Sequence, residues 1–349
     1  MIVGTLLAFA TIAVLAGPTL RWEPIDFCRF YAASKMILAG QNPYGQIPFF
    51  APPWFAFLMS PLLLVPCPSA ALAWVLLNVL IILASSSILW TQASAHSQRC
   101  RLALLGLTAV TPYALFAYMT GQLSIVMLGA CVLAAYGLVT DHQWAIAASL
   151  VLATLKPHVV ALPMLLVVLE LMRRRRWLPL LVASAILATL GLIAALLVPT
   201  WPRALLVSWT SGAFYEPREN LLGLAAFGIP LWLTYPFVAY TLLLWWRRSF
   251  DRYVLALAVV ANLLAIPYSR SYDYVLLLVP LAALWTTSGV PNKRLALSLA
   301  LAAQLLPLFR VFLPQTGLVE ALAPTLCMLG LLLVSDLSRH PSPQFDNQQ

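Results

Sequence analysis

The stretch RRRRWLPLLVASAILATLGLIAALLVP, residues 173–199, carries the two features that decide the class of fold. Four consecutive arginines, Arg173 to Arg176, precede an apolar run over 177–199 that no charged residue interrupts. A helix needs roughly 20 apolar residues to span the hydrocarbon core of a bilayer, and short Lys and Arg clusters are typical of cytoplasmic loops. The stretch therefore predicts a transmembrane helix whose arginine end faces the cytoplasm.

The same character extends over all 349 residues. The chain is 62% hydrophobic and only 9% charged, with a mean hydropathy of +0.91, whereas soluble domains carry about 25% charged residues. The apolar runs are continuous rather than alternating, which is typical of helices. The net charge of +9 comes from cationic clusters between these runs, so it does not indicate a nucleic-acid partner. The sequence predicts an all-α polytopic integral membrane protein.

Breaks at proline, glycine and charge divide the chain into one membrane domain over 1–337 and a polar tail over 338–349, which we expect to be disordered. About 11–13 helices are expected to cross the membrane. The short runs beside Lys156 are expected to form a hinged pair, and the proline-rich run 50–66 either a half-inserted helix or a crossing. The expected helices lie at 2–20, 70–91, 102–119, 122–140, 144–156, 158–172, 177–199, 230–246, 253–267, 273–287, 293–313 and 316–335.

Cationic clusters in alternate loops set the expected orientation, because the positive-inside rule places such loops in the cytoplasm. They are Arg99 with Arg101, Arg173 to Arg176, Arg247 with Arg248 and Arg252, Lys293 with Arg294, and Arg339. The other loops, including the one after the first helix, are then extracytoplasmic. Arg21, Arg29 and Lys35 favour the opposite side for that first loop, and a crossing by 50–66 would place it there too.

Polar side chains are most concentrated just after the first helix, in DFCRFYAASKMILAGQNPYGQIPFFAPPWFAFLMSPLLLVP, residues 26–66. The beginning of this stretch could form an amphipathic helix in the membrane interface. Asp26 lies a few residues beyond the outer end of the first helix, where a carboxylate can serve as a general base. The same aspartate could instead cap a helix or pair with Arg29.

Three further places carry polar groups among apolar residues. Lys156, in ATLKPHVV, is a lone cation whose burial would be costly, so it is either functional or extends its ammonium group to the interface. Arg270, Tyr272 and Asp273, in IPYSRSYDYVLLLVP, form either a binding site or an Arg–Asp pair within an aromatic belt. Gln122, in TGQLS, offers an amide for hydrogen bonding or belongs to an ordinary tight turn.

Motifs for metals and nucleotides are absent from the sequence. It contains no phosphate-binding P-loop, no His-Glu-x-x-His and no Asp-x-Asp pair, and its four histidines lie far apart. We therefore expect no metal and no cofactor. The five cysteines include no Cys-x-x-Cys pair. Their spacing alone does not predict a disulfide, although Cys28 and Cys67 could share one side of the membrane.

Five segments resemble, in the same order, glycosyltransferase family 87, whose members use polyprenyl-phosphate sugars and have the integral-membrane GT-C architecture. The resemblance extends from residue 1 to about residue 285. Its segments are the opening with Asp26 and LAGQNPYG, then FFAPPWFAFLMSPLLLVP, TGQLSIVMLGACVLAAYGL, LATLKPHVVALPMLLVVLELMRRRRW and SYDYVLLLVPLAAL. The resemblance implies a GT-C-like bundle with an extracytoplasmic first loop.

The resemblance also implies transfer of a hexose, with mannose expected, from a polyprenyl-phosphate sugar to a lipid-linked or cell-envelope glycan. The reaction would take place on the outer face of the plasma or inner membrane. Asp26 falls on the family's catalytic acidic position, Gln122 on its Gly-Gln and Lys156 on its Lys-Pro. Relatives often carry a histidine in a late Trp-x-His-Tyr-like stretch that is SRSYDY here, so no histidine role carries over. The further candidates for substrate binding are Arg29, Tyr44, Arg270, Tyr272 and Asp273.

The chemistry of the residues agrees with this reading, but others stay open. Inverting transfer needs one base and a cation for the leaving lipid phosphate, which Lys156 or Arg270 could supply without a metal. A transporter or lipid flippase would also explain the helices, although no repeated halves are seen. A membrane scaffold gives no reason for the polar first loop. An outer-leaflet ligase would share the cations but use a lipid pyrophosphate.

Overall fold

The computed structural model describes residues 24–90, 98–210, 228–248, 250–267, 269–287, 292–311 and 317–335. The expected helix at 2–20 and the polar tail at 338–349 lie outside these residues, as do Arg21 and Arg339.

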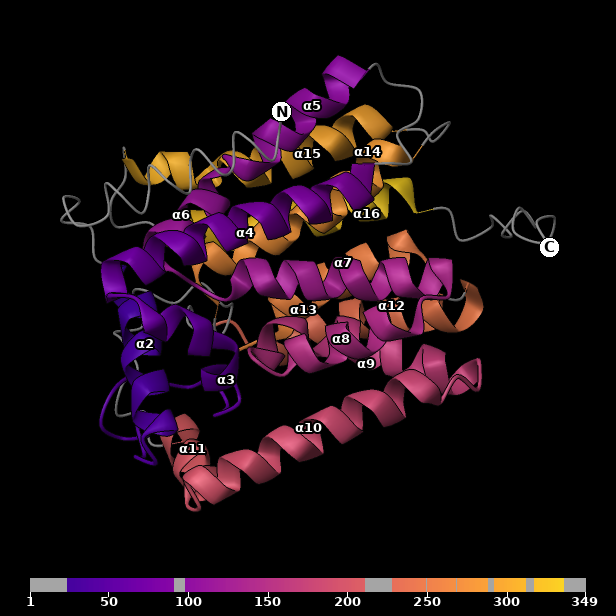
Figure 1. Ribbon diagram of the computed structural model, residues 1–349. Coiled ribbons are helices and arrows are strands. Elements are labelled where there is room, and N and C mark those ends of the chain that lie inside the picture. Colours follow the sequence, from indigo (N-terminus) through magenta and orange to yellow (C-terminus); the bar gives the residue numbers. More distant parts are fainter. Residues whose placement is uncertain are drawn as a thin grey trace.

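Every regular element among these residues is helical, in agreement with the expected all-α class (Figure 1). An isolated bridge between Tyr44 and Ile47 is the only extended pairing within the described ranges. The elements are α2 (Ile25–Leu38), α3 (Phe55–Met59), η2 (Ser60–Leu64), α4 (Cys67–Trp90), α5 (Gln98–Ala109), α6 (Pro112–Thr120), α7 (Ser124–Thr140), α8 (Gln143–Ala153), α9 (Pro157–Arg173), α10 (Leu178–Leu197), α11 (Trp201–Thr210), η5 (Leu231–Thr234), α12 (Tyr235–Arg248), α13 (Arg252–Ala265), η6 (Ser271–Leu277), α14 (Leu278–Thr286), α15 (Lys293–Leu305), η7 (Leu306–Val311) and α16 (Gly317–Val334).

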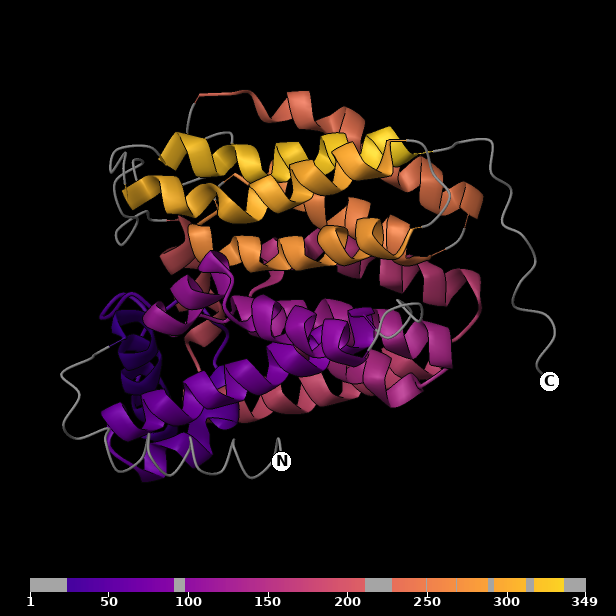
Figure 2. The same cartoon turned by 90° about the horizontal axis from the view of Figure 1, so that it is seen from above.

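The helices pack around one apolar core (Figures 1 and 2). Helix α7 packs on α4 and α8, while α13 packs on α9, α12, α14 and α16. Every residue of α13 from Val254 to Leu264 is buried, so this helix lies at the centre of the bundle. Helix α10 runs along the outer edge, with α8 as its main neighbour (Figure 1).

Two described helices, α4 and α10, are each long and apolar enough to cross a membrane. The bent pair Leu102–Ala109 and Pro112–Thr120 makes a third candidate span if it is counted as one. On α10, Leu181, Leu192 and Leu196 are 63–76% exposed. Soluble proteins rarely expose so continuous an apolar face, so these helices indicate a membrane protein. The expected number of about 11–13 crossing helices stays a prediction.

The expected helix at 102–119 is in fact two helices, α5 and α6, bent by 48° from one another. Pro112 has no N–H to continue the helical ladder, and it disfavours helical geometry in the residue before it. Thr111 accordingly adopts an extended conformation and accepts a hydrogen bond from the Ala114 amide at 3.4 Å, which caps α6. The hinge expected at Lys156 is confirmed, since α8 ends at Ala153 and α9 begins at Pro157.

The run 50–66 forms only two short elements, α3 and η2, and both pack against α2. The Phe30 and Phe55 rings pack edge to face at 5.3 Å, and the Tyr31 hydroxyl donates to the Val65 carbonyl at 2.7 Å. Helix α11 was not expected. It is a ten-residue helix with mostly exposed side chains, too short to give a membrane-span signal.

The arginines at the end of α9 lie at the opposite end of that helix from Lys156. Helix α9 begins at Pro157, next to Lys156, and ends at Arg173. At its far end Glu170 is fully buried and accepts hydrogen bonds from Arg173, from Arg174 Nε at 2.5 Å and from Trp245 Nε1 at 2.9 Å. Helices α2, α3 and α11 gather at the other end (Figure 1). We refer to these as the basic end and the polar end.

We predict that Glu170→Gln destabilises the protein by about 2 kcal/mol, because it removes the charge that two arginines and an indole N–H share. Asp141→Asn is the matched control, since that carboxylate pairs with Arg176 but its side chain is 58% exposed, and exposed pairs contribute little. The measurement is the thermal unfolding midpoint in detergent. Equal midpoints for the two variants would contradict the prediction.

Candidate active site

A close contact between α2 and the end of α6 positions the first candidate residue. Gly121 ends α6 with φ +73°, and a Cβ added to it would lie 2.4 Å from the Cβ of Phe27. Trp74 of α4 donates its indole N–H to the Gly121 carbonyl at 3.0 Å. The backbone at residue 121 therefore lies directly against α2, which only glycine permits. The residue that follows, Gln122, is carried to the first turn of α2.

Asp26 lies in that first turn and is held at both carboxylate oxygens. Gln122 Nε2 donates to Oδ2 at 2.6 Å, and Arg29 Nη1 donates to Oδ1 at 3.1 Å. The Asp26 side chain remains 23% exposed. The N-cap of α2 is Pro24, so Asp26 is not the capping residue, whereas the pairing with Arg29, which the sequence left open as an alternative, is present. Each oxygen keeps a lone pair for a further donor.

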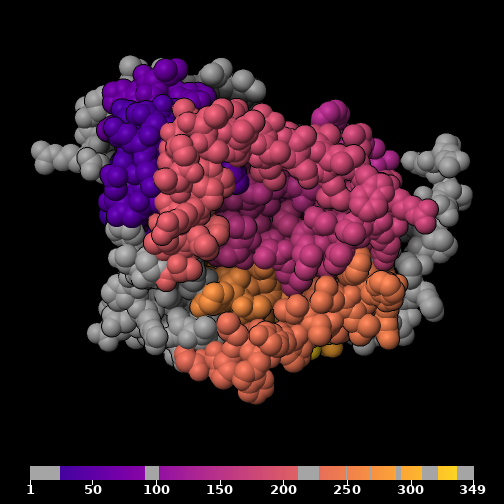
Figure 3. Space-filling view, turned by 90° about the horizontal axis from the view of Figure 1, so that it is seen from below, coloured from indigo at the N-terminus to yellow at the C-terminus, as the bar shows by residue number. Residues whose placement is uncertain are grey.

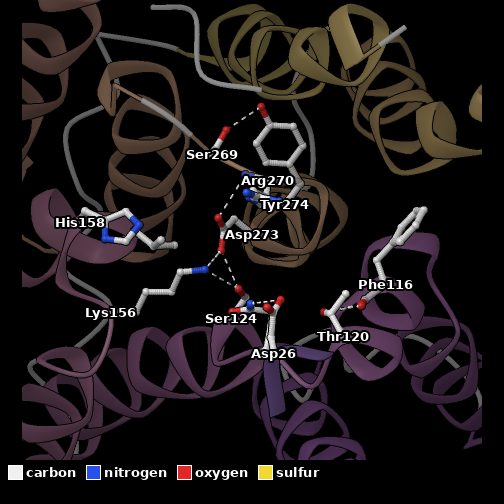
Figure 4. A network of polar contacts seen from close by, with 12 residues as sticks. Asp26, Phe116, Thr120, Ser124, Lys156, His158, Ser269, Arg270, Asp273 and Tyr274 are labelled. Atoms are coloured by element: carbon white, nitrogen blue, oxygen red, sulfur yellow. Dashed lines mark hydrogen bonds and ion pairs between the residues drawn. The ribbon is translucent and has the colours of Figure 1, made fainter. Parts of the chain in front are cut away.

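Lys156 is not the lone cation that the sequence indicated, because its ammonium group forms an ion pair with Asp273. Lys156 Nζ also donates to Ser124 Oγ at 3.2 Å and lies 4.6 Å from the centre of the Tyr272 ring. Ser124 Oγ in turn donates to Asp273 Oδ1 at 2.6 Å. The second Asp273 oxygen accepts from the Arg270 backbone N–H at 3.2 Å. Figure 4 shows this network around Lys156, Ser124 and Asp273, with Asp26 drawn close by.

The irregular first turn of α9 sets the position of Lys156. Val160 departs from helical geometry, and Pro163 has no N–H to bond the Val159 carbonyl. Asn262 of α13 supplies the missing partners. Its amide donates to the Val159 and His158 carbonyls at 2.7 and 3.0 Å, and its oxygen accepts from the Leu162 N–H at 3.0 Å. The side chain of Asn262 therefore completes the ladder that the proline interrupts.

Asp26, Gln122, Lys156 and Asp273 line one cavity of about 320 Å³. Three cationic side chains face it against two carboxylates, so its walls carry a surplus of positive charge. Seen from below, the molecule is hollowed between α10–α11 and the segments beyond residue 228 (Figure 3). The lining residues are Asp26, Arg29, Phe30, Pro48, Phe50, Ala51, Gln122, Leu123, Leu155, Lys156, Pro157, His158, Trp209, Arg270, Tyr272 and Asp273.

All but one of the site residues expected from the sequence face this cavity. The exception is Tyr44, which is 6% exposed and does not belong to the lining. Its hydroxyl donates to the Ala51 carbonyl at 2.9 Å, and burial raises its pKa, so the hydroxyl stays a donor. Tyr44 shapes the loop behind the cavity wall.

Three residues near the site were not predicted from the sequence. Ser124 and Asn262 lie inside apolar runs, where single polar residues carry no motif. Trp209 lines the cavity from the unexpected α11 and donates its indole N–H to the Phe50 carbonyl at 3.0 Å. The Pro163 break in α9 was the one available signal, because a proline inside a helix leaves a carbonyl for a partner such as Asn262.

The comparisons with known proteins give one match. The family model of glycosyltransferase family 87 matches residues 49–308, well over half of the chain. The matched segment contains Gln122, Lys156 and Asp273, and it begins after Asp26. No curated protein and no solved structure matches the chain. Among the residues that the structure describes, no three His, Cys, Asp or Glu side chains gather in a way that could hold a metal ion.

We predict that Gly121→Ala lowers the thermal unfolding midpoint strongly, because it adds an overpacking cost of about 1–3 kcal/mol against Phe27 to the strain of a positive φ. Gly45→Ala is the matched control. Gly45 also has a positive φ, +81°, but nothing lies within 4 Å of the added Cβ. A loss for Gly121→Ala no larger than that for Gly45→Ala would contradict the close contact.

Proposed function

The chain belongs to glycosyltransferase family 87, and from this premise we propose that it moves a hexose, with mannose expected, from a polyprenyl-phosphate sugar to a glycan acceptor. The family and the apolar helices together indicate a membrane glycosyltransferase. The acceptor in this proposal is a lipid-linked or cell-envelope glycan. The observation that supports this proposal best is that Asp26, Lys156 and Arg270 line one and the same cavity.

Asp26 is the proposed base. The acceptor hydroxyl donates to an Asp26 lone pair that Gln122 and Arg29 do not use. Asp26 takes the hydroxyl proton as the hydroxyl oxygen attacks the anomeric carbon. The bond from that carbon to the phosphate oxygen breaks on the opposite face, so the anomeric configuration inverts. The two donors hold the carboxylate in one orientation, which is what a positioned base requires.

The leaving lipid phosphate is proposed to bind at the other part of the cavity. Lys156 and Arg270 offer positive charge to the phosphate as the bond to the sugar breaks. The amino-terminal ends of α7 and α9 point to the same place, since they begin at Ser124 and Pro157, and helix N-termini favour anions. No step of this scheme passes through a metal ion.

The proposed side of the membrane is the extracytoplasmic one. The basic end holds Arg173 to Arg176 and the end of α12 with Arg247 and Arg248, and the positive-inside rule assigns such loops to the cytoplasm. The cavity lies at the polar end, one length of α9 away. Two described cations of the first loop favour the opposite orientation. Of these, Arg29 is paired with Asp26, and Lys35 Nζ lies 4.7 Å from the centre of the Tyr31 ring.

We predict that Asp26→Asn lowers sugar transfer by about 100-fold or more while leaving the fold intact, because the amide cannot accept the proton. The assay follows labelled polyprenyl-phosphate mannose into the glycolipid fraction of membranes that contain the protein. Asp141→Asn at the basic end should transfer at the wild-type rate. Unchanged transfer by Asp26→Asn would remove Asp26 as the base. Transfer by neither wild type nor variant with any carrier tried would favour a transporter.

We predict that the double variant Lys156→Gln/Asp273→Asn folds but binds donor weakly, with its KM for the donor raised by about tenfold or more. The double change removes both charges of the ion pair, so neither is left buried alone. If Lys156 had only a structural role, this variant would keep the wild-type KM for the donor. A KM equal to that of the wild type would therefore overturn the phosphate role of Lys156. Lys35→Gln, a cation of the polar end outside the cavity, is the control.

A further inference from the structure

We propose that Cys28 and Cys67 form a disulfide bond that joins α2 to the start of α4. Their Sγ atoms lie 2.8 Å apart although 39 residues separate them in the chain. Both side chains are partly exposed, whereas Cys131 and Cys327 are fully buried. The pair lies outside the cavity lining, so it is a site separate from the proposed sugar-transfer chemistry.

The surrounding packing holds the two thiols together. Phe27, the neighbour of Cys28, packs against Trp74 of α4 in a tilted arrangement with ring centres 6.0 Å apart. Tyr31, one turn later on α2, donates to the Val65 carbonyl just before α4. A disulfide joins sulfurs about 2.05 Å apart, so the present separation closes by about 0.8 Å. A shift of this size is small for side-chain rotation about χ1.

The compartment decides whether the bond forms. This inference rests on the proposed function only in that both cysteines lie at the polar end, which we place outside the cytoplasm, where disulfides persist. One thiol, as thiolate, attacks a disulfide-bonded oxidant and releases one oxidant thiolate. The second thiolate attacks the mixed disulfide and releases the other. Cys28 and Cys67 together lose two protons and two electrons, and the oxidant disulfide becomes a dithiol.

The bond would reinforce the position of the proposed base. Cys28 lies two residues after Asp26 on α2, and Cys67 is the first residue of α4. Trp74, also on α4, holds the Gly121 carbonyl that precedes Gln122. A covalent link at Cys28 therefore ties α2 to the helix whose Trp74 bonds Gly121, the residue before the hydrogen-bond partner of Asp26.

The test traps thiols in intact cells that express the full chain. Acid first stops thiol exchange, and N-ethylmaleimide then blocks all free thiols in the denatured protein. Reduction followed by a polyethylene-glycol maleimide labels the cysteines that were in disulfide bonds. We expect two polymer chains per wild-type protein, none for Cys28→Ser or Cys67→Ser, and two for the control Cys131→Ser. Peptide mass spectrometry of unreduced wild type should identify residues 28 and 67 in one cross-linked species. Wild type that gains no polymer after reduction would overturn the disulfide.

Two further measurements separate this inference from the proposed function. Reduction should lower the thermal midpoint of wild type but not that of Cys28→Ser, and an equal response of both would count against the bond. Sugar transfer is measured on the same membranes. If both thiols are alkylated in the first step and transfer is full, the disulfide is overturned and the proposed function stands. If the disulfide is found but no sugar is transferred, the disulfide is supported and the result counts against the proposed function.

Discussion

The buried ion pair between Lys156 and Asp273 joins the start of α9 to the first turn of η6 across 117 residues of sequence. Two charges in an apolar bundle are tolerated only when their remaining hydrogen-bonding capacity is met. Ser124 and the Arg270 backbone N–H meet it here. The beginnings of α7, α9 and η6 must therefore converge, and this convergence creates a polar cavity at one end of the apolar bundle.

The cavity depends on interruptions of helices rather than on the helices themselves. Gly121 ends α6 against α2, and Pro157 begins α9. Pro163 opens the helical ladder that Asn262 completes. Each interruption leaves backbone or side-chain polar groups that must find partners. Because those partners come from other elements, the interruptions hold the segments that carry Asp26 and Lys156 in one arrangement, which suits the proposed base and phosphate partner.

The two ends of the bundle use charge differently. At the basic end, Glu170 is fully buried, and its partners Arg173 and Arg174 are each about one-third exposed, so the carboxylate anchors cations that still reach solvent. At the polar end the carboxylates of Asp26 and Asp273 are outnumbered by the cations around the cavity. One arrangement holds a loop in place, and the other leaves positive charge for a ligand.

That the protein is helical and belongs to a membrane was predictable from the sequence. Both features depend on properties that can be read along the chain, namely the length of apolar runs and the positions of cations between them. The hinge at Lys156 was also predictable from the sequence. Asp26, Gln122 and Asp273 stand out in the sequence as polar residues beside apolar runs, and the structure places them in one cavity, while their roles stay predictions. The partners of these residues were not predictable. That Lys156 pairs with Asp273, that Tyr44 lies behind the cavity wall and that Cys28 meets Cys67 depend on which helix ends converge. Contacts between distant segments are set by packing, and packing is decided only when the chain buries its apolar faces together.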